Sequence, residues 1–164
     1  SVLVDRKLVD VQVHTAEQSV PFNMDMSAEL HTATEAIGSA SEFPAMPDTD
    51  ANLVEVPLEQ LAWARSGDKG DKANIGVMAR KSDFFPWIVA TLTESYVASR
   101  FSHFMASSEI DRFVLPRLPA LNFVLHNVLG GGGIASLRND PQAKGFAQIL
   151  LDTPVKVPES LLED

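Results

Sequence analysis

The segment spanning residues 65–74 has the residue types and spacing of a small ligand-binding loop. It holds two glycines, five charged side chains and two neutral hydrogen-bonding side chains, in the order Arg65, Ser66, Gly67, Asp68, Lys69, Gly70, Asp71, Lys72, Ala73 and Asn74. Glycine tolerates positive φ, so successive backbone N–H groups could converge on an anion. The alternative is a polar hairpin loop whose Asp and Lys side chains satisfy one another, which is the commoner use of such a composition.

Two other kinds of site fit the same segment poorly. A nucleotide P-loop needs Gly-Lys-Ser/Thr and a helix directly after it, and both are missing here. Asp68, Asp71 and Asn74 could contact a divalent metal ion, but hard cations prefer more oxygen ligands than these three side chains supply. The sequence therefore predicts no metal site.

A second polar segment, residues 122–133, is predicted to end a helix. Asn122 and His126 are four residues apart, so both would lie at the margin of an apolar helical stripe and could face a cleft. His126 is the candidate general acid or base, although a histidine of this kind more often packs its ring and hydrogen-bonds locally. The following glycines would allow close approach of a backbone or ligand, or would simply end the helix: Gly130, Gly131, Gly132 and Gly133.

The rest of the sequence predicts a sheet and helices that would position these two segments. Apolar and alternating patterns predict strands over residues 58–65, 74–80, 109–115 and 146–151. Capping residues and helical spacing predict helices beginning at Ser82 or Asp83, at Thr91, and over residues 119–129. Helices separated by strands indicate an α+β fold, a two-layer sandwich of about four strands with helices on one face.

The expected organisation is one folded domain with extensions. Residues 1–32 are expected to form an N-terminal extension with an edge strand, because Val9, Val11 and Val13 alternate with polar residues. Residues 33–56 have the composition of a linker, residues 57–157 form the domain, and residues 158–164 are a C-terminal tail. The sequence begins with Ser, so we expect a processed product or a piece of a longer protein.

Charge and cysteine content narrow the functions further. The 13 basic and 22 acidic residues give a net charge of −9, which disfavours nucleic acid and anionic membranes as partners. The absence of cysteine excludes disulfides, thiolate metal sites and a cysteine nucleophile, and it suits a cytoplasmic protein. No apolar run approaches the roughly 18 residues of a membrane span.

Both polar segments also carry a family resemblance. The matching blocks are residues 64–71, Asn74-Ile75, 121–125, 129–132 and 136–138, which together resemble the small C-terminal domain of the acyclic terpene utilisation (AtuA-like) family over about residues 57–152. The resemblance implies a ferredoxin-like fold, a larger N-terminal domain as partner, and a role in the breakdown of branched or terpenoid acids as coenzyme A esters. Such a polyanionic ester would suit Arg65, Lys69 and Lys72. The resemblance supplies no catalytic residue.

Three functions remain open from the sequence. The chain could be an accessory domain of an AtuA-like protein that uses residues 65–74 and 122–133 as a ligand or interdomain surface, with a homo-oligomer or the larger domain as partner. It could be a small enzyme acting on a carboxylate or thioester, with His126 as acid or base and Arg65 or Lys69 holding an oxygen. It could also be a purely structural oligomerisation module. The enzyme hypothesis requires His126 and residues 65–74 to line one cleft.

Overall fold

A computed structural model describes residue 5 and residues 8–22, 42–48, 50–105, 109–133 and 135–163. The chain divides into two units, Ser1–Ile37 and Gly38–Asp164. In the first unit, β1 (Gln12–His14) pairs antiparallel with β2 (Ser19–Pro21). Both strands are exposed along their length, so this hairpin differs from the half-buried strand expected around Val9 to Val13.

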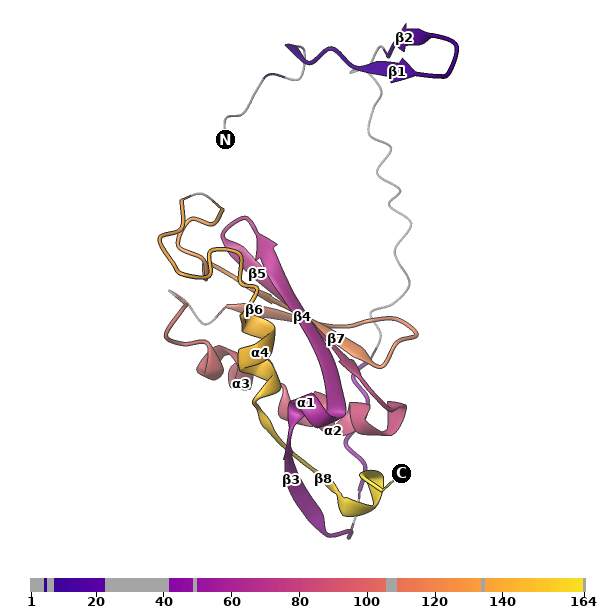
Figure 1. The fold of residues 1–164 in the computed structure, drawn as a ribbon. Coiled ribbons are helices and arrows are strands. Elements are labelled where there is room, and N and C mark those ends of the chain that lie inside the picture. The colour runs from indigo at the N-terminus through magenta and orange to yellow at the C-terminus, as the bar shows by residue number, and fades with distance from the viewer. Residues whose placement is uncertain are drawn as a thin grey trace. The chain divides into compact units, whose positions relative to one another are not determined.

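The second unit is built on a four-stranded antiparallel sheet in the order β4-β5-β7-β6 (Figure 1). The strands are β4 (Ala62–Lys69), β5 (Lys72–Ala79), β6 (Ile110–Val114) and β7 (Ala120–Leu125). Gly70 and Asp71 form the turn between β4 and β5, and β5 and β7 occupy the centre of the sheet. The predicted α+β class and the four-stranded sheet are confirmed.

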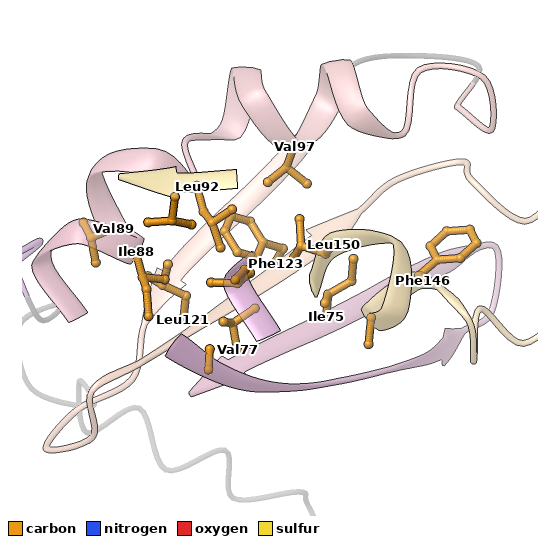
Figure 2. Close-up of a cluster of buried hydrophobic side chains, with 14 of the residues drawn as sticks. Ile75, Val77, Ile88, Val89, Leu92, Val97, Leu121, Phe123, Phe146 and Leu150 are labelled. Atoms are coloured by element: carbon orange, nitrogen blue, oxygen red, sulfur yellow. The ribbon is translucent and has the colours of Figure 1, made fainter. Parts of the chain in front are cut away.

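Short helices cover one face of this sheet. They are α1 (Leu58–Leu61), α2 (Phe85–Thr91) after the 3₁₀ turn η2 (Ser82–Phe84), α3 (Glu94–Arg100) and α4 (Phe146–Leu151). Figure 2 shows the apolar layer between them, to which the sheet contributes Ile75, Val77, Leu121 and Phe123 and the helices Ile88, Val89, Val97 and Leu150. Within the described ranges, no helix is long and apolar enough to cross a membrane.

Three expected elements are wrong. The strand expected over residues 58–65 begins instead as the helical turn α1, because Leu58 and Leu61 are both buried at helical spacing before β4 starts. The helix expected over residues 119–129 is the strand β7, whose buried residues alternate with less buried ones. The strand expected over residues 146–151 is the helix α4, which buries one side at positions 146, 147 and 150.

The helix starts are closer to expectation. A helical segment begins at Ser82, as predicted. The cap of α3 is Thr93 rather than Thr91, and its hydroxyl accepts a hydrogen bond from Tyr96 N at 3.1 Å. Thr91 lies at the end of α2, where its hydroxyl donates to Trp87 O at 2.9 Å. The shift moves the helix start by two residues and leaves the buried face in place.

A second, two-stranded sheet joins the two ends of the domain. In it β3 (Leu53–Pro57) pairs antiparallel with β8 (Pro154–Pro158), and Leu53 lies opposite Pro158. The 3₁₀ turn η3 (Glu159–Leu161) follows β8. Residues 53–56 of the expected linker therefore belong to a strand, while residues 33–41 and 49 lie outside the described residues.

Candidate functional site

The side of the sheet that faces away from the helices is the candidate site, and we call it the open face. Strand side chains alternate between the two sides of a sheet, and the register of the four strands fixes which residues share a side. Trp63, Met78 and Phe113 are 49%, 41% and 49% exposed on it. The open face comprises Trp63, Arg65, Gly67, Lys69, Lys72, Asn74, Gly76, Met78, Glu109, Asp111, Phe113, Ala120, Asn122, Val124 and His126.

The structure brings the two polar segments of the sequence together on this face. Asn74 on β5 and Asn122 on β7 lie on neighbouring strands, and Asn74 Nδ2 donates to Asn122 Oδ1 at 3.2 Å. Most of the segment expected to be a loop is strand, since β4 continues to Lys69 and β5 begins at Lys72. Asp68 is paired with Ala73 on the helix-covered side, so its carboxylate does not share a side with Asn74.

The glycine run packs directly against the β4–β5 turn. Gly130, Gly131, Gly132 and Gly133 all have positive φ, from 49° to 96°. A Cβ at Gly132 would lie 2.0 Å from Gly70 O, which is closer than any side-chain carbon can approach. These glycines therefore serve a backbone contact between the two segments.

Asp71 holds that contact together. Its Oδ1 accepts hydrogen bonds from Gly131 N at 2.8 Å and Leu129 N at 3.2 Å, and its backbone carbonyl accepts from Val128 N at 3.0 Å. The N–H groups of Leu129 and Gly131 thus bind a carboxylate of the chain itself. The anion nest expected within residues 65–74 would use other N–H groups, those of β4, β5 and their turn, and it stays a prediction.

Ser66 links β4 to the start of α4 on the covered side. It is 6% exposed, and its hydroxyl donates to Ala143 O at 2.5 Å and accepts from Ala147 N at 2.9 Å. Asp140 holds the same turn, because its carboxylate accepts from Lys144 N and from Gly145 N, each at 2.8 Å. Ser66 is therefore a positioning residue within the fold.

Lys144 reaches the edge of the sheet from this turn. Its Nζ would lie 3.2 Å from a Cβ placed at Gly67, so the missing side chain at Gly67 gives the ammonium its room. Lys144 thereby joins Arg65, Lys69 and Lys72 at the β4 and β5 side of the open face. This contact could not be predicted, because no pattern near Lys144 indicates that residues 77 or 78 positions earlier lie beside this turn.

His126 lies at the other side of the face, among carboxylates. Its Nε2 is 2.8 Å from Asp111 Oδ2 and its Nδ1 is 3.8 Å from Glu109 Oε1, and its side chain is 13% exposed. His126 and Arg65 share the open face, but β5 lies between their strands, a separation of roughly 10 Å between strand axes. The structure brings His126 to Asp111, a pairing that the sequence did not indicate.

A shallow apolar groove of about 270 Å³ crosses the open face at the end of the sheet where the β6–β7 loop lies. Trp63 and Met78 line it from the strands, Leu118 from the β6–β7 loop, and Arg65 lies at its border. Arg80 covers part of the Trp63 ring, with its guanidinium 4.8 Å from the ring centroid. His126 does not line this groove, so histidine and groove are separate features of one face.

Arg112 is a charged residue of the covered side. Its guanidinium donates to Val89 O, lies 3.8 Å from Glu94 Oε2, and stacks on Phe43 at 4.3 Å from the ring centroid. Burial lowers the pKa of Arg112 below its ordinary value, and the carboxylate of Glu94 opposes that shift. The group stays charged at neutral pH and ties α2, α3 and residues 42–48 to β6.

The fold and the site define an α+β domain with one sheet face covered by helices and the other open. A family model described as the AtuA ferredoxin-like domain matches residues 56–156, more than half of the chain. The chain therefore belongs to that family, as the sequence resemblance implied. No curated protein and no solved structure matched it.

Proposed function

We propose that this AtuA ferredoxin-like domain is an accessory domain that binds another protein surface through its open face. One observation carries the proposal: Trp63, Met78 and Phe113 remain about half exposed together on one sheet face, beside an apolar groove. Apolar surface left in water costs about 25 cal/mol per Å², so an exposed cluster of this kind is characteristic of an interaction site.

The biological setting of the proposal comes from the family. AtuA-like proteins are associated with acyclic terpenoid and acyl-coenzyme A catabolism, and we place this domain in the same process. The partner would be a second copy or the larger AtuA-like N-terminal domain. We place the protein in the cytoplasm, with which a chain that has no cysteine is compatible.

A coenzyme A ester is the second candidate occupant of the open face. No ion pair joins Arg65, Lys72 or Lys144 to another residue of the described ranges, so these cations are free to bind an anion. Arg65 also borders the apolar groove. The strand from Trp63 to Lys69 spans about 20 Å, enough for an acyl chain in the groove and phosphates at the basic end.

A thermal-shift titration with a branched acyl-coenzyme A ester tests this second function. A ligand bound at the site raises the apparent melting temperature by mass action, and Arg65→Ala should abolish that increase while Gln148→Ala on α4 keeps it. An unchanged melting temperature at saturating ester would exclude the ester. An enzymatic role for His126 would add a requirement, namely product formation that depends on His126 and Asp111 together.

Cysteine labelling tests the main proposal, because the natural chain contains no cysteine. Val124→Cys places one thiol on the open face and keeps Trp63, Met78 and Phe113, and Gln148→Cys places the control on the exposed side of α4. We expect the open-face thiol to react at least about tenfold more slowly when a larger AtuA-like domain is added or the protein is concentrated. An open-face thiol whose reaction rate stays unchanged under every condition would reject the proposal.

A further inference from the structure

The open face is divided by charge into two halves. Its β4 side carries Arg65 and Lys69, with the Lys144 ammonium beside Gly67 and Lys72 next to it on β5. Its β6 side carries Glu109 and Asp111. Four of the 13 basic residues of a protein with a net charge of −9 thus lie on one side of a single face.

The two halves lie at matching levels along the strands. Lys69 pairs with Lys72 across β4 and β5. One position further along, Ala73 pairs with Leu125 and Leu125 with Ile110, so Lys72, His126 and Glu109 lie at one level. His126 N donates to Glu109 O at 3.2 Å, which extends that register to Glu109. Lys69 and Glu109 are therefore the two ends of one row, and Gly67 and Asp111 are the ends of the next.

A two-fold axis that runs parallel to the strands, about 5 Å above the midline of the open face, exchanges these halves between two copies. The axis falls between β5 and β7, so a second copy packed face to face places its β6 over β4 without changing the level. Lys69 then lies opposite Glu109 of the second copy, and the Lys144 ammonium opposite its Asp111. Arg65 lies opposite the exposed ring of Phe113, an arrangement that favours a cation–π contact.

We propose that the occupant of the open face is a second copy of this chain, bound face to face about that axis. The inference rests on the proposed function, since it requires the open face to bind a protein surface. Aligned sheets pack about 10 Å apart with strands within about 30° of parallel, which keeps both charged rows in register. The face measures roughly 500 Å² as a flat area, and side-chain relief raises this toward the roughly 800 Å² per partner of a stable complex.

The charge pattern is what selects a second copy among other occupants. An unrelated partner would have to supply an acidic half and a basic half in mirrored order, whereas this face supplies its own complement. The overall negative charge opposes non-specific self-association, so only an alignment that matches the two halves brings copies together.

Sedimentation equilibrium on charge-reversed chains tests the inference. Lys69→Glu gives a copy whose row is acidic at both ends, and Glu109→Lys gives one that is basic at both ends. Each variant alone should dimerise on the order of tenfold more weakly than the natural chain, because the symmetry repeats every repulsion. An equal mixture should recover the natural affinity, since both rows of the heterodimer then pair opposite charges.

The controls separate this inference from the proposed function. Gln148→Glu changes the charge on α4 and should leave the dimer affinity unchanged. A natural chain that stays monomeric, or a mixture that stays as weakly associated as its two components, overturns the dimer. If the Val124→Cys thiol is then still protected by the larger AtuA-like domain, the proposed function stands without the dimer. If it is not protected, both fail.

Discussion

Asp71 Oδ1 accepts a hydrogen bond from Gly131 N at 2.8 Å, across a sequence separation of 60 residues. This contact fastens the turn at the end of the β4–β5 hairpin to the glycine run that follows β7. Because both segments leave the same end of the sheet, the contact fixes the level of the charged row formed by Lys69, Lys72, His126 and Glu109. The shape of the open face thus depends on a carboxylate that does not itself lie on it.

Asp71→Ala is expected to destabilise the domain. It leaves the N–H groups of Leu129 and Gly131 without their acceptor, and charge-assisted hydrogen bonds of this kind contribute about 2 kcal/mol to the free energy of unfolding. Asp68→Ala is the matched control, and it should change that free energy by less than about 0.5 kcal/mol. Urea unfolding of both variants measures the difference, and equal losses would contradict the role assigned to Asp71.

Gly132→Ala should be among the most damaging single-atom additions to the chain. The new Cβ would meet Gly70 O at 2.0 Å and would also force an alanine to keep φ at 68°. Together the clash and the left-handed backbone should lower the free energy of unfolding by about 3 kcal/mol or more. Gly133→Ala has the same backbone strain at φ 49° with no neighbouring atom within 4 Å, so it should cost only about 1 kcal/mol in thermal unfolding.

Ser66→Ala removes one donor and one acceptor from a buried position. Ala143 O and Ala147 N lose their partner together, so the free energy of unfolding should fall by about 2 kcal/mol. Ser95→Ala, at an exposed position of α3, should stay within about 0.5 kcal/mol of the natural chain. Guanidinium unfolding compares the two. A Ser66→Ala variant as stable as Ser95→Ala would show that the turn before α4 does not depend on this hydroxyl.

Substitution of two phenylalanines on opposite sides of the sheet should separate effects on the free energy of unfolding from effects on dimerisation. Phe123 is fully buried against the helices, so Phe123→Ala should lower the free energy of unfolding by about 4 kcal/mol. Phe113 is 49% exposed on the open face, so Phe113→Ala should change the stability of the monomer by less than about 1 kcal/mol. Its main effect should be weaker dimerisation in sedimentation equilibrium. A large stability loss for both variants would mean that the open face is covered within the monomer.

The fold class could be predicted although some helices and strands were exchanged, because the apolar patterns still indicated where regular elements lie. Leu121, Val124 and Leu125 fit a helical stripe, and Leu121, Phe123 and Leu125 fit an alternating strand equally well. Pairing with β5 decides between them, and that pairing is a tertiary contact. The sheet kept its four strands because one strand was gained at residues 120–125 and one was lost at residues 146–151.

The two segments of the candidate site could be predicted from the sequence, but the residues from other elements that lie beside them could not. Glycine and charge density marked residues 65–74 and 122–133, which the structure brings together through Asp71 and through the Asn74–Asn122 hydrogen bond. Lys144 and Asp111 could not be found in the same way, because each reaches the open face through contacts that no local pattern encodes. The sequence also missed the apolar groove, since residues 58–65 were expected to form one strand, whereas α1 ends at Leu61 and β4 then places Trp63 on the open face.

The pairing of β3 with β8 suits this domain to insertion into another protein. Leu53 and Pro158 are opposite one another, so the polypeptide enters and leaves this pair of strands at the same point. A unit whose ends meet can be inserted into a loop of a host protein, or closed by a short connector and reopened elsewhere, without disturbing its packing. The same scaffold is thus suited to being fused, inserted or circularly permuted while the opposite end of its sheet keeps its geometry.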